Sequence, residues 1–157
     1  MSIKVDMTST DVDRQLALLN YYPEILQKYF RPALGTSVKS LAEMIRPNIP
    51  RATGQALAAF KSRVTGGKGI NLQGQVGWYG NNPAWYIRLV EGGVKPHKIE
   101  ARKGGFLWFG GHVVRSVDHP GFSARGFMAA GYAAMQPMIE ALMGQASEQV
   151  VNELAVK

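Results

Sequence analysis

Three histidines and a nearby serine are the residues of this chain whose types are suited to metal binding or nucleophilic catalysis. His97, His112 and His119 lie fifteen and seven residues apart, whereas zinc ligands usually come in pairs about two to five residues apart. Ser123 lies in GFSARG, which is one residue longer than the G-x-S-x-G turn that exposes a nucleophilic serine. Asp118 and His119 are adjacent, so in extended backbone their side chains point apart. The spacing therefore predicts neither a metal site nor a catalytic triad.

Glu91 is the carboxylate best placed for a buried role, because it follows the apolar run AWYIRLV. A buried glutamate needs a partner. Arg88 lies one turn away if the segment is helical, and Arg102 or Arg115 is within reach if it belongs to a sheet. We interpret Glu91 as a structural residue that locks a loop, and we predict that the chain is not an enzyme.

The composition narrows the chemistry further. The chain contains no cysteine, which excludes disulfides, thiolate metal sites and cysteine nucleophiles. No metal and no other cofactor is predicted.

The start of the sequence, MSIKVDMTSTDVD, lacks the apolar run of a secretion signal. No apolar stretch is long enough to span a bilayer, so no membrane partner is predicted.

The net charge of +7 is distributed unevenly. Residues 28–68 hold eight lysines or arginines and one acid, and residues 88–125 hold seven against three acids, whereas both ends of the chain are net acidic. This pattern suits a solvated surface, a non-specific nucleic-acid-binding domain, or head-to-tail contact between copies. The loop KPHKIEARKGG offers four cations for phosphate contacts, namely Lys95, Lys98, Arg102 and Lys103. Neither a base-reading helix nor an aromatic platform is identified, so specific readout is not predicted.

The hydrophobic pattern predicts an α+β fold with a small antiparallel sheet packed against long N-terminal and C-terminal helices. A helix is expected over residues 9–22, and a second one begins at Pro23 and ends at RPNIP. Pro32 predicts a kink or break near residue 31. Residues 57–65 and 70–78 are expected to pair as a hairpin.

The second half of the chain is expected to hold a compact sheet and the last helix. AWYIRLVEGG is either a strand or a short helix, and residues 94–116 form short strands with a loop. Pro120 and Gly121 make a tight turn beside His119, after which Ser123 caps a long helix over residues 125–154. Phe127 anchors that helix in the core.

The length of 157 residues fits a single domain, residues 1–157. Within it we distinguish an N-terminal helical arm (1–22), a helix plus sheet with the loop 92–112 (23–125), and a C-terminal helix (126–157).

Two stretches resemble a family of tailed-bacteriophage neck or tail-completion proteins, which are head–tail joining or minor tail proteins. The first is IPRATGQALAAF, and the second is WYIRLVEGGVKPHKIEARKGGFLWFGGHVVRSVDHPGFSARGFMAAGY. In the second, an aromatic residue precedes Glu-Gly, PH-x-I, an apolar strand, HPG and an aromatic anchor, in the order of the family. The similarity covers residues 25–145. The chain departs from the family where Gly92–Gly93 replaces Gly-Thr and where Gly126 replaces a proline.

The resemblance implies an α+β virion protein that forms a ring at the head–tail junction and joins tail to head, as a neck, tail-completion or tail-terminator protein. Its implied partners are copies of itself, with a hexamer as one ring size, phage connector or neck and tail-tube proteins, and DNA if it passes through the channel. It would be made in the cytoplasm of a bacterial host. A subunit or tail contact is expected in the loop at Lys95, His97, Lys98, Arg102, Lys103, Phe106, Leu107 and Trp108. Structural roles are expected for Arg88, Glu91, His119, Pro120, Gly121 and Phe127.

Overall fold

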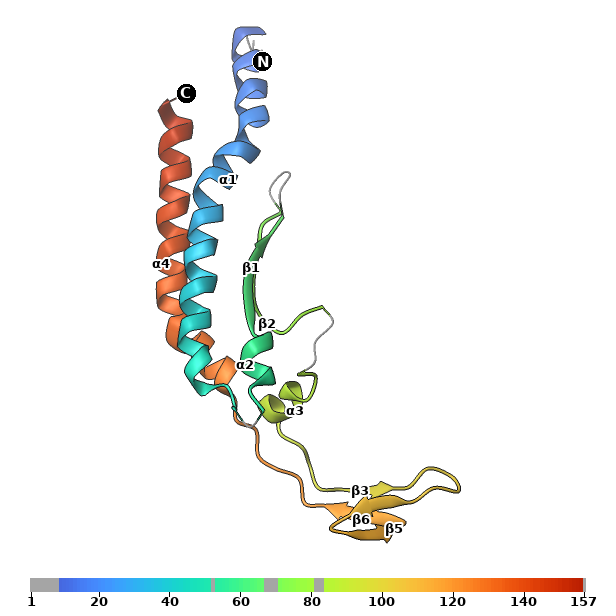
Figure 1. Cartoon of the computed structure of the whole chain (residues 1–157). Coiled ribbons are helices and arrows are strands. Elements are labelled where there is room, and N and C mark those ends of the chain that lie inside the picture. Colours follow the sequence, from blue (N-terminus) through green and yellow to red (C-terminus); the bar gives the residue numbers. More distant parts are fainter. Residues whose placement is uncertain (1–8, 52, 67–70, 81–83, 157) are drawn as a thin grey trace, which may run out of the picture.

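Two long helices lie side by side in the computed structural model (Figure 1), which describes residues 9–51, 53–66, 71–80 and 84–156. They are α1 (Ser9–Ile45) and α4 (Phe127–Val156). A hairpin of β1 (Lys61–Thr65) and β2 (Gln73–Gly77) lies along α1. The predicted α+β class, with small antiparallel sheets against long terminal helices, is confirmed.

Helix α1 contains Pro23 and Pro32 in its interior, yet it continues through both. The expectation of two helices is therefore wrong, and of the kink or break expected near residue 31, the break does not occur. Each proline removes one backbone hydrogen bond, but Ile25, Val38 and Ile45 are buried at positions spread along the helix, and their packing keeps it continuous. Figure 1 shows that the N-terminal part of α1 is bent relative to the rest.

The end of α1 follows the sequence pattern. The α-helix stops at Ile45 and a 3₁₀ turn, η1, covers Arg46–Asn48. The prolines of RPNIP lack backbone N–H donors and so cannot extend the helical hydrogen bonding. The ambiguous segment that follows is both helix and strand: α2 (Gln55–Ala59) leads directly into β1.

The predicted hairpin is confirmed over the residues that the structure describes. β1 and β2 are antiparallel, and their register runs from the pair Lys61–Gly77 to the pair Thr65–Gln73. Gly74 lets the hairpin approach α1, because a Cβ atom there would lie 2.6 Å from Cγ1 of Val38. Ile70, the expected first residue of the second strand, lies outside the described residues.

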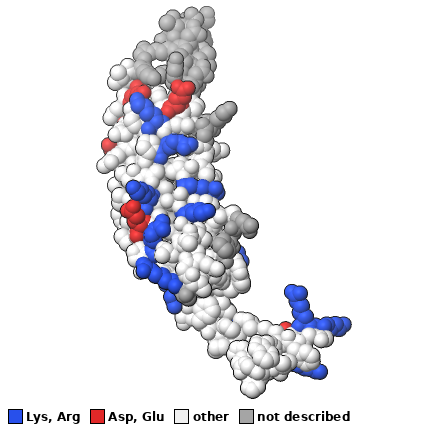
Figure 2. All heavy atoms as spheres, viewed as in Figure 1, with Lys and Arg blue, Asp and Glu red and all other residues white. Residues whose placement is uncertain are grey.

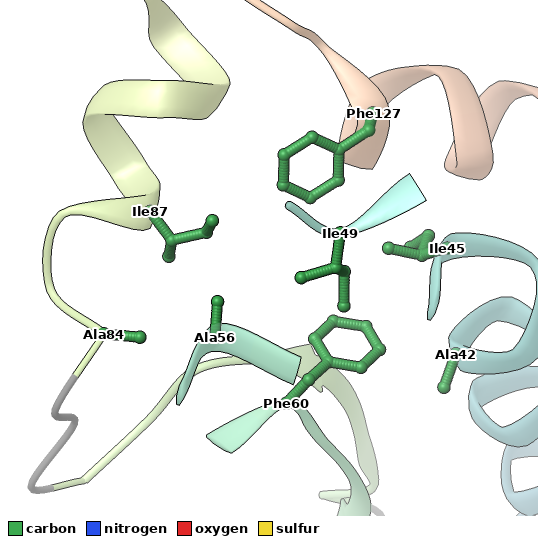
Figure 3. Packing of buried hydrophobic residues seen from close by; sticks show 8 residues of the cluster. All are labelled: Ala42, Ile45, Ile49, Ala56, Phe60, Ala84, Ile87 and Phe127. Atoms are coloured by element: carbon green, nitrogen blue, oxygen red, sulfur yellow. The ribbon is translucent and has the colours of Figure 1, made fainter. Parts of the chain in front are cut away.

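The core lies where the ends of the elements meet (Figure 3). It joins α1, α2, α3 (Ile87–Gly92) and the first residue of α4. The buried residues are Ala42, Ile45, Ile49, Ala56, Phe60, Ala84, Ile87 and Phe127. The indole N–H of Trp78, which packs against this cluster, donates a hydrogen bond of 2.7 Å to the carbonyl of Ala56. The segment left open as strand or helix, AWYIRLVEGG, thus supplies a helix, α3.

The last helix begins two residues later than expected and runs through Pro137 without interruption. It approaches the end of α1 at Gly131, where a Cβ atom would lie 2.5 Å from Cγ1 of Ile45. No helix in the described part of the chain combines the length and apolar character needed to cross a membrane.

Four short strands lie away from the helices at the end of an extended segment (Figure 1). They are β3 (His97–Glu100), β4 (Leu107–Phe109), β5 (His112–Val114) and β6 (Ser116–His119). The short strands expected over residues 94–116 are confirmed. His119, expected beside the turn that Pro120 and Gly121 make, is the last residue of β6, which pairs with β3 along its whole length and extends beyond the expected range of strands.

Candidate interaction site

The four distal strands form one ribbon, which we call the distal hairpin (residues 97–119). β3 pairs with β6, and β4 pairs with β5, both antiparallel. The amide of Ala101 donates to the carbonyl of Arg115 at 2.8 Å, and residues 102–106 then bulge out before β4 begins. Gly110 and Gly111 close the tip with φ values of 59° and 83°. Two consecutive positive φ angles are the requirement of a tight two-residue hairpin turn.

The tip of the distal hairpin exposes large aromatic side chains. Trp108 is 75% exposed, Phe106 64% and Phe109 62%, whereas Leu107 is half-buried. Ile99 and Val117 are direct cross-strand partners and therefore share a face. This face carries an apolar groove of about 410 Å³ that includes Ile99, Leu107, Phe109 and Val117.

The distal hairpin has little cover from its own chain. All four residues of β3 are exposed, and the ribbon lies away from α1 and α4 in Figure 1. An isolated two-stranded hairpin is at best marginally stable in water. An exposed apolar patch of this kind is typical of an interaction site.

The base of the distal hairpin is a tight junction built around two glycines. Val94 and Phe122 exchange backbone hydrogen bonds of 2.9 Å in both directions. Gly93 and Gly121 flank this pair with φ values of 72° and 73°. A Cβ atom at Gly121 would collide with the carbonyl oxygen of Val94. Pro120 and Gly121 therefore belong to a crossing of two chain segments, which sets the direction in which the hairpin leaves the body.

His97 and His119 face each other across β3 and β6. Their rings stack with centroids 5.0 Å apart and an interplanar angle of 26°. The amide of Gly121 donates to Nδ1 of His119 at 3.0 Å, which places the His119 proton on Nε2 when the ring is neutral. Nδ1 of His97 lies 2.9 Å from the carbonyl of Lys95 and donates to it. This pair is the first cross-strand pair of β3 and β6, and it links the hairpin to the junction at its base.

Glu91 holds the start of α4. Its Oε1 accepts hydrogen bonds from the amides of Met128 (3.0 Å) and Ala129 (3.2 Å). These are two of the N–H groups that a helix leaves unpaired at its first turn, and a carboxylate there also opposes the positive end of the helix dipole. The second oxygen, Oε2, is buried without a hydrogen-bond partner among the described atoms.

Two expectations about this region are wrong. The partner of Glu91 is the backbone of α4 and not an arginine: Arg88 is exposed, and Arg102 and Arg115 lie in the distal hairpin. Ser123 does not cap α4, which begins only at Phe127. An acid 37 residues before Met128 supplies the cap, and no local sequence pattern signals such a distant partner.

The basic residues of the predicted loop are all exposed. Lys98 forms an ion pair of 3.7 Å with Glu100 on the surface, a kind of contact that contributes little to stability. Arg102 and Lys103 lie with Arg115 around a hollow of about 340 Å³ at the bulge. Figure 2 shows lysines and arginines projecting from the distal hairpin, separated by a mostly uncharged stretch from those on the body.

The structure brings together only part of the predicted contact residues. Phe106, Leu107 and Trp108 lie near the tip, whereas Lys95 and His97 lie at the junction. Phe109 and Val113 were not predicted, although both are more than half exposed. The signal for Phe109 was present in FLWFGG, because an uninterrupted apolar run places apolar residues on both faces of a strand; Val113 lies outside this run, opposite Trp108 on β5.

Within the described residues, no group of three His, Asp or Glu side chains is arranged to hold a metal ion. The sequence matches no protein-family model and no curated protein, and the fold matches no solved structure.

Proposed function

We propose that this chain is a structural virion protein of a tailed phage or prophage, which forms a ring at the head–tail junction and joins tail to head. We also propose that it performs no catalysis. The distal hairpin is the contact with a neighbouring subunit or with the tail. The observation that carries the proposal is the exposed aromatic tip of a hairpin that lies away from its own body.

The arrangement supports an assembly role because it separates folding from binding. The body has its own buried core, and the hairpin presents Phe106, Trp108 and Phe109 to solvent. The glycine junction directs the hairpin outward. The order of EGG, PH-x-I and HPG, which motivated the family resemblance, coincides with α3, the first strand of the hairpin and the junction.

The test is assembly in the phage that encodes the chain. The variant carries Phe106→Ser, Leu107→Ser and Trp108→Ser. Heads and tails should accumulate separately in electron micrographs, because the apolar contact is lost while the body still folds. Circular dichroism of the purified variant checks that the helices are retained.

The matched control replaces Val151 and Val156 by serine, since both are exposed valines of α4 far from the hairpin. These particles should be infectious. Normal particles from the triple variant would contradict the role of the hairpin, and absence of the chain from purified wild-type particles would contradict the virion role itself.

A second candidate function is non-specific nucleic-acid binding, favoured by the grouping of Arg102, Lys103 and Arg115 around one hollow. Each phosphate contact releases counterions, so binding to duplexes of unrelated sequence should weaken steeply with salt. Fluorescence anisotropy measures this directly. A failure to bind DNA at about 50 mM salt, where such binding is strong, would remove this function.

A further inference from the structure

An apolar groove of about 530 Å³ lies between α1, β2 and α4 of the body. Its lining includes Leu34, Val38, Leu41, Val76, Ala129 and Tyr132. Ser37 also lines it, but its hydroxyl already donates to the carbonyl of Ala33 at 2.8 Å. The groove therefore offers mostly apolar contacts, and its volume is in the range of about 300–1,000 Å³ that ligand pockets occupy.

The α4 wall of this groove is apolar beyond the face that packs on α1. Tyr132 is 53% exposed, and Ala129 and Ala133 occupy exposed positions beside it. A helix that is apolar on several faces is normally covered on several faces. This part of α4 is thus better suited to contact with another protein surface than to solvent.

We propose that the groove receives the aromatic tip of the distal hairpin, Phe106, Trp108 and Phe109, from a second copy of this chain. The inference rests on the ring proposed above and adds the surface to which the hairpin binds. Each chain carries one tip and one groove, so the contact is head-to-tail. Contacts of this type close into rings when the rotation between copies permits it.

The occupant is a second copy because the distal hairpin lies away from α1 and α4 of its own chain (Figure 1), which line the groove with β2, and its direction is set by the junction at Gly93 and Gly121. Charge complementarity is confined to the α4 side of the groove. The distal hairpin has four lysines and arginines against two acids, and residues 127–156 contain three glutamates and no lysine or arginine, whereas residues 28–48 on the α1 side hold four lysines and arginines against one acid. Contact between two hairpins would instead bring like charges together, which disfavours it.

Cross-linking tests the contact directly, since the chain contains no cysteine. One population carries Val113→Cys, the cross-strand neighbour of Trp108, and leaves the aromatic tip intact. The other carries Ala129→Cys in the groove. Mixing them with a short bismaleimide should give a covalent heterodimer. The control, Ala134→Cys, is exposed and lies about 140° around α4 from Ala129, and it should cross-link to Val113→Cys at least tenfold less.

The same positions test the effect on assembly. Ala129→Lys places a cation in the groove and should weaken self-association at least tenfold in sedimentation or light scattering, whereas Ala134→Lys should leave it unchanged. Both positions are exposed, so folding should be retained.

The outcomes separate the groove contact from the ring. If the wild-type chain assembles but Ala129→Lys has no effect, or if both cysteines cross-link equally, the groove contact is overturned and the ring stands. A wild-type chain that stays monomeric up to about 1 mM also overturns the groove contact. Even a weak contact, with a dissociation constant of about 1 mM, would be substantially occupied at that concentration. The virion role is then decided separately by the presence of the chain in purified particles.

Discussion

The body and the distal hairpin use the same aromatic residues for opposite purposes. In the body, Phe60 and Phe127 are buried and flank Trp78, with ring centroids 4.9 Å and 6.2 Å from it. In the hairpin, Phe106 and Trp108 are largely exposed. An aromatic side chain stabilises the fold where its own chain covers it, and it is available for association where it is not. The comparison indicates that the aromatic residues of the body contribute to stability, whereas those of the hairpin are left free for the contact proposed above.

The largest expected effect comes from removing one aromatic from each region. Phe127→Ala should lower the free energy of unfolding by about 3–5 kcal/mol, the usual loss for a buried phenylalanine. Trp108→Ala should change it by less than about 0.5 kcal/mol, as for most surface substitutions. Urea denaturation of dilute protein measures both. Similar losses in the two variants would show that the hairpin contributes to the stability of the body.

The junction between the two regions gives the next effect. In Gly121→Ala the new Cβ atom is added to a backbone with positive φ and lies too close to the carbonyl of Val94. The free energy of unfolding should therefore fall by more than the roughly 1–2 kcal/mol that left-handed backbone alone costs. Gly104→Ala, with a φ of 78° and open space around it, should cost only that conformational amount. Hydrogen exchange of the Val94 and Phe122 amides reports on the junction. Faster exchange in the Gly104 variant than in the Gly121 variant would contradict this assignment.

Glu91 tests how firmly α4 is tied to the junction. Glu91→Ala removes the acceptor of two helix-start amides and should cost about 1–2 kcal/mol, as the loss of a helix cap does. Glu91→Gln keeps an acceptor oxygen and should retain most of the stability. Thermal unfolding measures both variants. Equal losses would mean that the negative charge, and not the hydrogen bonds, holds the helix.

The smallest effect is expected at the ion pair between Lys28 of α1 and Glu153 of α4, whose charged atoms are 2.7 Å apart. The hydrogen bond to Glu153 raises the pKa of Lys28 above its ordinary value of 10.5. A raised folded-state pKa stabilises the protein at pH values below the ordinary one, and this contribution is lost as the pH rises through the raised value. Lys28→Gln should therefore lower the melting temperature slightly at neutral pH and not at all in strong alkali. A larger difference in alkali than at neutral pH would contradict this coupling.

Local patterns in the sequence were sufficient to predict several of the helices and strands. The alternation in residues 70–78 and the turn before it predicted the β1–β2 hairpin, and RPNIP predicted the end of α1, because strand periodicity and the missing N–H of proline act over a few residues. The same local reasoning failed at Pro32, where burial of Val38 and Ile45 in the tertiary structure outweighs one lost hydrogen bond.

The candidate site was harder to predict from the sequence. The run FLWFGG identified part of the aromatic tip, but its exposure follows from the direction in which the junction points the hairpin. The strand at Ser116–His119 was missed because its partner, β3, begins nineteen residues earlier than β6.

The sequence by itself determined the fold class, the β1–β2 hairpin, the end of α1 and the apolar character of FLWFGG, since these depend on residues close together in the chain. Only the tertiary structure decided that Glu91 caps α4, that His97 stacks on His119 and that α1, β2 and α4 leave a groove open. Each of these depends on contacts between residues far apart in the sequence, whose geometry is set by the packing of whole elements and not by any local pattern.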